Sequence, residues 1–193
     1  MQKQTTDKMS ITGIHTFRFY DTSSKKASEI EKAIEFHISM KPLWNAKAHS
    51  ARYKELVNML SPYFKREMTV KNIVVTAGRS VLAQRLANTT TYTGTINYGA
   101  LGSSSAAVNN ADTQLGTEVF RKVVASASFT GAVAFIDFFY SKADTNGTYQ
   151  EFATFIDGTG SANSGQLFTH LLTGGWVKTA SESMTVSCTY TFS

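Results

Sequence analysis

The chain has one cysteine, two prolines and no long hydrophobic run among its 193 residues. The single cysteine, Cys188, excludes an internal disulfide, and its place in an alternating segment favours a small buried side chain over a nucleophile. The lack of eighteen consecutive apolar residues argues against a transmembrane helix, and the polar start MQKQTTDKMS lacks the apolar core of a secretory signal. We therefore expect a soluble protein made in the cytoplasm, with no membrane contact.

Charge is scarce in the second half of the chain. Residues 1–87 carry 15 Lys and Arg against 7 Asp and Glu, a net charge of +8, whereas residues 88–193 carry 4 against 7, a net charge of −3. Basic side chains on amphipathic helices often form only a solvated face, but they can also contact nucleic acid or an acidic protein. The candidate basic contact surface consists of Lys25, Lys26, Lys47, Arg52, Lys54, Lys65 and Arg66.

The segment GAVAFIDFFY, residues 131–140, is apolar on both faces of a period of two. This pattern predicts a central strand with a neighbour on each edge and packing on each face. Residues 119–129, through the Thr130–Gly131 turn, and residues 148–157, through ADTNG, are the expected neighbours. Asp137 is the one polar residue in the middle, so it either reaches water or is held by donors from a neighbouring segment.

Three segments in the first half of the chain show helical periodicity. Apolar residues recur every three or four positions over residues 24–40, and again from Ala46 to the stop at Pro62. A third helix is expected over residues 77–87. Residues 10–20 alternate as a short strand, and residues 72–76 suit either a strand or the start of a helix.

The remainder is rich in Thr, Ser, Gly and aromatic residues, which predicts strands separated by turns. The expected strands are 95–101, 119–129, 133–141, 148–157, 166–173 and 183–192. The predicted fold class is therefore α+β, with an N-terminal strand and short amphipathic helices followed by an antiparallel β-sandwich. We expect a basic N-terminal region over residues 1–87 and a sandwich over 88–193, with helix 77–87 as a possible part of one compact unit.

No motif in the chain points to catalysis, a cofactor or a metal. The four histidines lack metal-ligand spacing, and GTGSANSG, from Gly158, lacks the Gly-Lys-Ser/Thr ending of a phosphate-binding loop. Asp112 and Glu118 are conceivable as a carboxylate pair, but no nucleophile or base accompanies them. Loop oxygens of Asp144, Asn146 and Asp157 suit either a calcium site or ordinary turns. We expect neither a catalytic residue nor a cofactor, and no metal site.

Aromatic residues exceed what the interior of a thin sandwich needs. Aromatic side chains are favoured in the cores of interfaces, so some of them are expected to meet another subunit. The alternative is that all of them lie in the core. The candidate assembly surface consists of Phe17, Phe19, Phe139, Tyr149 and Trp176.

Several phrases between residues 73 and 192 resemble those of structural proteins from tailed-bacteriophage virions. The phrases are TAGRSVLAQRLA, TINYGALG, DTQLGTEVFRK, FIDFFY, NGTYQEFATFID, ANSGQLFTHLL and WVKTASESMTVSCTYTF. They are also similar, more weakly, to the N-terminal attachment domains of phage tail-collar and fibre proteins. None is a catalytic motif, and residues 1–70 lie outside the resemblance.

The resemblance implies a structural virion component of the tail, baseplate, neck or fibre attachment, made in the host bacterial cytoplasm. Such a protein is expected to form a homo-oligomer and to bind other virion proteins. Two alternatives remain open. One is a glycan-binding fibre module that uses Trp176, Tyr149 and the Gly-rich loops, and the other is a basic protein that contacts packaged DNA near the portal.

Overall fold

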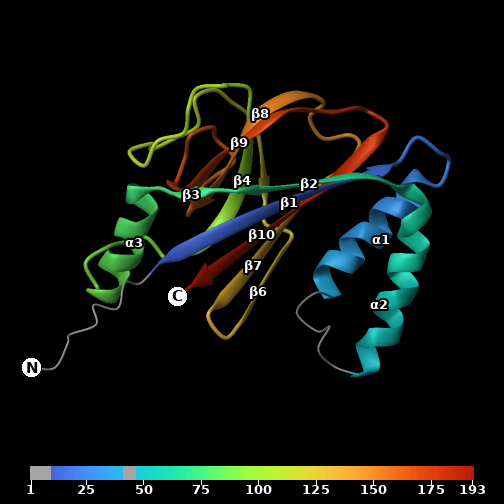
Figure 1. Ribbon diagram of the computed structural model, residues 1–193, viewed down its shortest axis with the longest axis horizontal. Helices are drawn as coiled ribbons and strands as arrows, with labels where there is room; N and C mark the ends of the chain where they lie inside the picture. Colours follow the sequence, from blue (N-terminus) through green and yellow to red (C-terminus); the bar gives the residue numbers. More distant parts are fainter. Residues whose placement is uncertain (1–9, 41–46) are drawn as a thin grey trace, which may run out of the picture.

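The computed structural model describes residues 10–40 and 47–193, with the backbone alone for 47–50. Within these residues, two five-stranded antiparallel sheets pack face to face, and three α-helices lie around them (Figure 1). Sheet A has the strand order β2-β1-β10-β7-β6, and sheet B the order β3-β9-β8-β4-β5. The α+β sandwich predicted from the sequence is confirmed.

Sheet A joins strands from both ends of the chain. Its members are β1 (Ile11–Asp21), β2 (Phe64–Lys71), β6 (Ser126–Thr130), β7 (Val133–Tyr140) and β10 (Glu182–Phe192). β1 and β10 pair along their whole length, from Ile11 opposite Phe192 to Asp21 opposite Glu182. Alternation along each strand turns one set of side chains to sheet B and the other set to the outer face.

Sheet B consists of β3 (Ile73–Val74), β4 (Ile96–Gly102), β5 (Glu118–Val123), β8 (Gly147–Ile156) and β9 (Gln166–Lys178). Its inner face and that of sheet A share one aromatic core, in which Phe17, Phe138 and Phe152 are fully buried. A second apolar cluster includes Ala153 and Phe155 of β8 together with Leu115, which comes from the long loop between β4 and β5. That loop therefore contributes to the packing of sheet B.

Helices α1 (Ala27–Met40) and α2 (Lys47–Leu60) pack against one end of the outer face of sheet A (Figure 1). The apolar positions of α1 recur at helical spacing, and Ile30, Ile34 and Ile38 are buried against Tyr20 and Phe139. Helix α3 (Thr76–Leu86) packs near β9, where Gly78 touches the backbone of Phe168. No described helix is long and apolar enough to cross a bilayer.

The partners of the segment 131–140 differ from the sequence prediction. This strand, β7, pairs with β6 through the predicted Thr130–Gly131 turn, but its other neighbour is β10 and not residues 148–157. The ADTNG segment crosses to sheet B, where residues 147–156 form β8. β7 is consequently next to an edge, and β10 is the middle strand of sheet A.

Other parts of the structure also differ from the sequence prediction. The expected strand 119–129 is two strands, β5 in sheet B and β6 in sheet A, because the chain changes sheets at residues 124–125. The alternating segment 64–71, which was not predicted, forms edge strand β2. The undecided segment 72–76 contains the short strand β3 followed by the first residue of α3. Because β1, β2 and β3 are integral to the sheets, a division at residue 88 does not separate two folded units.

Candidate functional site

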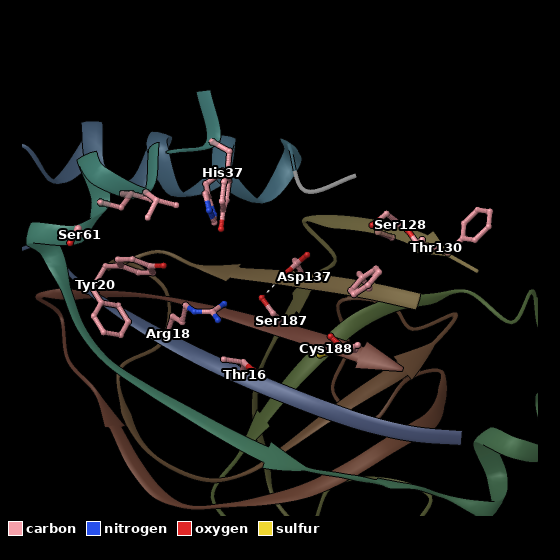
Figure 2. A pocket seen from close by; sticks show the side chains of 18 residues that line it. Thr16, Arg18, Tyr20, His37, Ser61, Ser128, Thr130, Asp137, Ser187 and Cys188 are labelled. Carbon is pink, nitrogen blue, oxygen red and sulfur yellow. Dashed lines mark hydrogen bonds between the residues drawn. The ribbon is translucent and has the colours of Figure 1, made fainter. Parts of the chain in front are cut away.

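A groove of about 980 Å³ lies on the outer face of sheet A, between the α1–α2 hairpin and β6 (Figure 2). Its floor is formed by β1, β10, β7 and β6, and its roof by His37 of α1 with Tyr53 and Val57 of α2. The helices cover only one end of the sheet, so the rest of this face stays open as the floor. The floor residues are Thr16, Arg18, Tyr20, Ala127, Ser128, Phe129, Thr130, Phe135, Asp137, Ser187, Cys188 and Thr189.

The strand register aligns the polar floor residues in rows. Thr16 lies opposite Ser187, and Ser187 lies opposite Asp137, so three strands place polar side chains side by side. In the next row Thr189 lies opposite Phe135, which in turn lies opposite Ser128. The floor therefore combines hydroxyl groups with an aromatic ring.

Asp137 is held by a donor from a neighbouring strand, which confirms one of the two sequence expectations for it. The Ser187 hydroxyl donates to its carboxylate at 2.6 Å, and Asp137 is 2% exposed. Ser187, His37 and Asp137 all line the groove.

The other charged group of the floor also has an intramolecular partner. The Arg18 guanidinium donates to Glu67 of β2 at 2.6 Å. In the roof, the His37 ring stacks on Tyr53 with 5.3 Å between ring centroids. Burial raises the pKa of Tyr20, a further floor residue, which stays neutral over the physiological range. The groove thus presents aromatic surface and hydroxyl groups, with Arg18 in an ion pair and Asp137 hydrogen-bonded to a serine hydroxyl.

The structure places the candidate assembly surface inside the protein. Phe17, Phe19, Phe139, Tyr149 and Trp176 are between 0 and 8% exposed, and four of them belong to the main aromatic core. Phe139 packs instead under α1 and α2. The aromatic surplus is thus needed to fill the space between two five-stranded sheets, and an assembly surface has to consist of other residues.

The candidate basic surface is spread over the helical end of the molecule. Lys25 and Lys26 precede α1, and Arg52 and Lys54 lie on α2, which begins at Lys47. The side chains of Lys25, Lys26, Arg52 and Lys54 are exposed. Lys65 and Arg66 on β2 both bind the buried carboxylate of Glu182, at 2.8 and 2.5 Å. These two cations therefore have a structural role, and contact with DNA stays a prediction.

The Glu182 cluster predicts a loss of stability in acid. Burial alone would raise the pKa of Glu182, but hydrogen bonds from Arg66, Lys65 and the Thr179 amide outweigh it and lower the pKa from 4.5 to about 2. The ion pairs are fully present above pH 4.5 and are lost as the pH falls towards 2, at a cost of about 2–3 kcal/mol. Urea denaturation of the Glu182→Gln variant should show a correspondingly smaller decline over this window, and an unchanged decline would contradict the assignment.

A second buried polar cluster joins the β4–β5 loop to sheet B. Glu151 of β8 accepts hydrogen bonds from the backbone amides of Ser104, Gly116 and Thr117, at 2.9–3.2 Å. His170 of β9 bonds to Glu151 at 2.9 Å through Nε2 and to Asp112 at 2.7 Å through Nδ1. Asp112 thus pairs with His170 and not with Glu118.

The GTGSANSG loop wraps around an arginine. Glu118 and Arg121 form a bidentate pair at 2.6 and 2.8 Å, and Nη1 of Arg121 donates to the carbonyls of Thr159 and Ser164. The guanidinium also lies over the Phe155 ring, 4.7 Å from its centroid. This loop is therefore fixed by side chains of the protein itself, in agreement with its interpretation as a turn-rich loop.

The conceivable calcium ligands have other partners. Asp144 binds Lys122 at 2.7 Å, Asn146 accepts from Lys178 at 3.0 Å, and Asp157 accepts from the amide and hydroxyl of Thr93. No group of three or more metal-ligating side chains gathers within residues 10–40 and 47–193. The three oxygens thus act in loop structure.

Sequence reasoning missed most of the groove. Its lining comes from helices and strands that are distant along the chain, and Ser187 meets Asp137 across fifty residues. One signal was available: the Thr and Ser residues of 183–192 alternate with apolar residues and indicate a wet face of the strand. Comparison of the chain with models of protein families, with curated protein sequences and with solved structures gives no match.

Proposed function

We propose that the protein is a non-catalytic binding protein that acts through the groove on sheet A, as a structural component of a bacteriophage virion. The observation that supports binding is the groove itself, an open sheet face that is lined by aromatic rings and hydroxyl groups. The place in a virion, at the tail, baseplate, neck or fibre attachment, rests on the resemblance of residues 73–192.

The chemistry of the groove suits a polypeptide segment from a neighbouring virion protein. Hydroxyl groups of Thr16, Ser128 and Thr189 can bond to a main chain, and the rings of Phe135 and Tyr20 offer apolar contact. Arg18 already binds Glu67, and Asp137 already accepts the hydrogen bond from Ser187. A segment rich in small and apolar residues is the partner that this lining fits.

Blocking the groove should prevent incorporation into particles. Thr189→Trp places an indole on the groove floor, and we expect at least about a tenfold loss of incorporation, because a segment that fills the groove cannot share it with the ring. The measurement is quantitative mass spectrometry of particles purified from cells that supply the variant. Thr148→Trp, at an exposed position of β8 in the other sheet, should incorporate like the wild type.

The two outcomes that would contradict the proposal are distinct. Absence of the wild-type protein from purified particles would overturn the structural role in a virion. Equal incorporation of Thr189→Trp and Thr148→Trp would overturn the use of the groove and leave the structural role standing. Circular dichroism of both variants verifies that each has folded.

Glycan binding in the same groove is a second candidate. Stacking of an aromatic ring against a sugar, with hydroxyl groups beside it, would need surfaces of the kind that Phe135, Ser187 and Thr189 provide. The residues first expected for this role, Trp176 and Tyr149, are buried. A glycan array with the purified chain distinguishes the candidates, since binding there that Thr189→Trp abolishes would favour the glycan.

A further inference from the structure

Strand β6 is an open edge of sheet A that lacks the usual protection against strand addition. No described strand pairs with its outer side, so alternate backbone N–H and C=O groups of Ser126–Thr130 point away from β7. Its sequence, SASFT, contains no charge and no proline. Natural edge strands are usually kept from pairing by charges, proline, bulges or very short length.

The other three edges of the sandwich carry such protection. Edge strand β3 has only two residues, and α3 begins two residues after it. The two remaining edges are charged, β2 with Lys65, Arg66, Glu67 and Lys71, and β5 with Glu118, Arg121 and Lys122. β6 is therefore the exception among the four.

Phe129 makes this edge apolar as well as open. The register places Ala127 and Phe129 on the same face as Ile136 of β7, which is the face turned to the core. β5, at the edge of sheet B, packs against β7, so the core ends before it reaches β6. As a result the Phe129 side chain is 79% exposed, although it lies on the inner face of sheet A.

We propose that β6 pairs with β6 of a second copy of this chain, antiparallel and centred on Ser128. In this register Ser126 lies opposite Thr130 of the other copy, and Ala127 lies opposite Phe129. Each phenylalanine then covers a small residue, and hydroxyl side chains pair across the junction. No like charges meet, because the strand has none. Sheet A thereby continues through both copies around a two-fold axis, with the same patch used twice.

The self-pairing deepens the proposed assembly role and rests on it. It supplies the surface that the buried aromatic residues cannot provide, and it needs no rearrangement of the core. Edge pairing also lengthens the floor of the groove, since Ser128 and Thr130 lie on the groove face of β6 and also at the junction.

A charge-reversal experiment tests the register directly. Ser128 lies opposite its own copy at the two-fold axis, so Ser128→Lys brings two like charges together, and Ser128→Glu does the same with the opposite sign. We expect the wild type to be a dimer at tens of micromolar by sedimentation equilibrium, and each variant to dimerise about tenfold more weakly. An equimolar mixture of the two variants should restore dimers. Thr69→Lys, on exposed edge strand β2, is the matched control and should dimerise like the wild type.

Every other result overturns the proposal. A monomeric wild type, or variants that dimerise as strongly as the wild type, would show that β6 is not the interface. Weakened variants that fail to recover on mixing would reject pairing centred on Ser128. Thermal unfolding of each variant shows whether the fold is kept, and Phe129→Ala, at a largely exposed position, provides a second way to weaken the junction without adding charge. A monomeric chain that is still found in particles would separate this failure from failure of the proposed function.

Discussion

Lowering the pH from about 6.5 to about 4.5 is expected to remove about 2–3 kcal/mol from the free energy of unfolding, because His15 is buried without charge. Its ring lies between Phe152 and Tyr190, and Nδ1 is 3.1 Å from the sulfur of Cys188. Burial lowers the pKa of His15 from 6.5 to about 3, with Asn72 beside it acting in the opposite direction.

The sign follows from the proton balance. Between pH 6.5 and 3 the unfolded chain binds a proton at this histidine and the folded chain does not, so stability falls as the pH falls. The slope is about 1.4 kcal/mol per pH unit while only one of the two states is protonated. Above pH 4.5 this decline is separate from that of Glu182, whose pair is still intact there.

Urea denaturation at several pH values between about 4.5 and 7 measures this slope. His15→Leu should flatten it, because an aliphatic side chain binds no proton in either state, although the variant can be less stable overall. A wild-type free energy of unfolding that does not change over this range would contradict the neutral, buried state of His15.

Glu151→Ala is expected to cost about 3–5 kcal/mol, because the substitution leaves three backbone donors and Nε2 of the buried His170 without their partner. Glu151 is 1% exposed and binds the amides of Ser104, Gly116 and Thr117 as well as His170. Its loss should release the β4–β5 loop before the rest of the fold, since this carboxylate accepts hydrogen bonds from three backbone amides of the loop.

Denaturant unfolding of the purified variant measures the cost, and hydrogen exchange of residues 103–117 shows whether the loop opens. Glu67→Ala is the control, because the side chains of the Glu67–Arg18 pair are 42% and 34% exposed and such pairs contribute less than about 1 kcal/mol. Equal costs for the two substitutions would mean that the buried cluster does not hold the loop.

Periodicity predicted the elements well where one face of each element is buried and the other is wet. α1 and β10 show this: Ile30, Ile34 and Ile38 repeat at helical spacing, and Val186 and Cys188 alternate with polar residues. β2 shows the same alternation, with Met68 and Val70 partly buried and Glu67, Thr69 and Lys71 exposed. Because half of the residues of β2 are charged, the alternation does not stand out in its sequence.

Partner choice could not be predicted from local pattern. The ADTNG segment has the composition of a hairpin turn, yet the chain uses it to pass from sheet A to sheet B. β7 pairs with β10, which lies more than forty residues further along the chain. The residues of the turn do not indicate which strand β7 will pair with. The groove depends on the same long-range pairing, because Thr16, Ser187 and Asp137 become neighbours only when β1, β10 and β7 are aligned.

The pairing of β1 with β10 has a consequence for the order of folding. During synthesis β1 leaves the ribosome long before β10, and until β10 follows, its edge has no strand to pair with on that side. Contacts of such long sequence separation raise the contact order and slow folding, because loop closure must precede the gain from pairing. The nascent chain therefore keeps the β10-facing edge of β1 unpaired until residues 182–192 have been made, and its backbone donors and acceptors are open to wrong pairing during that interval.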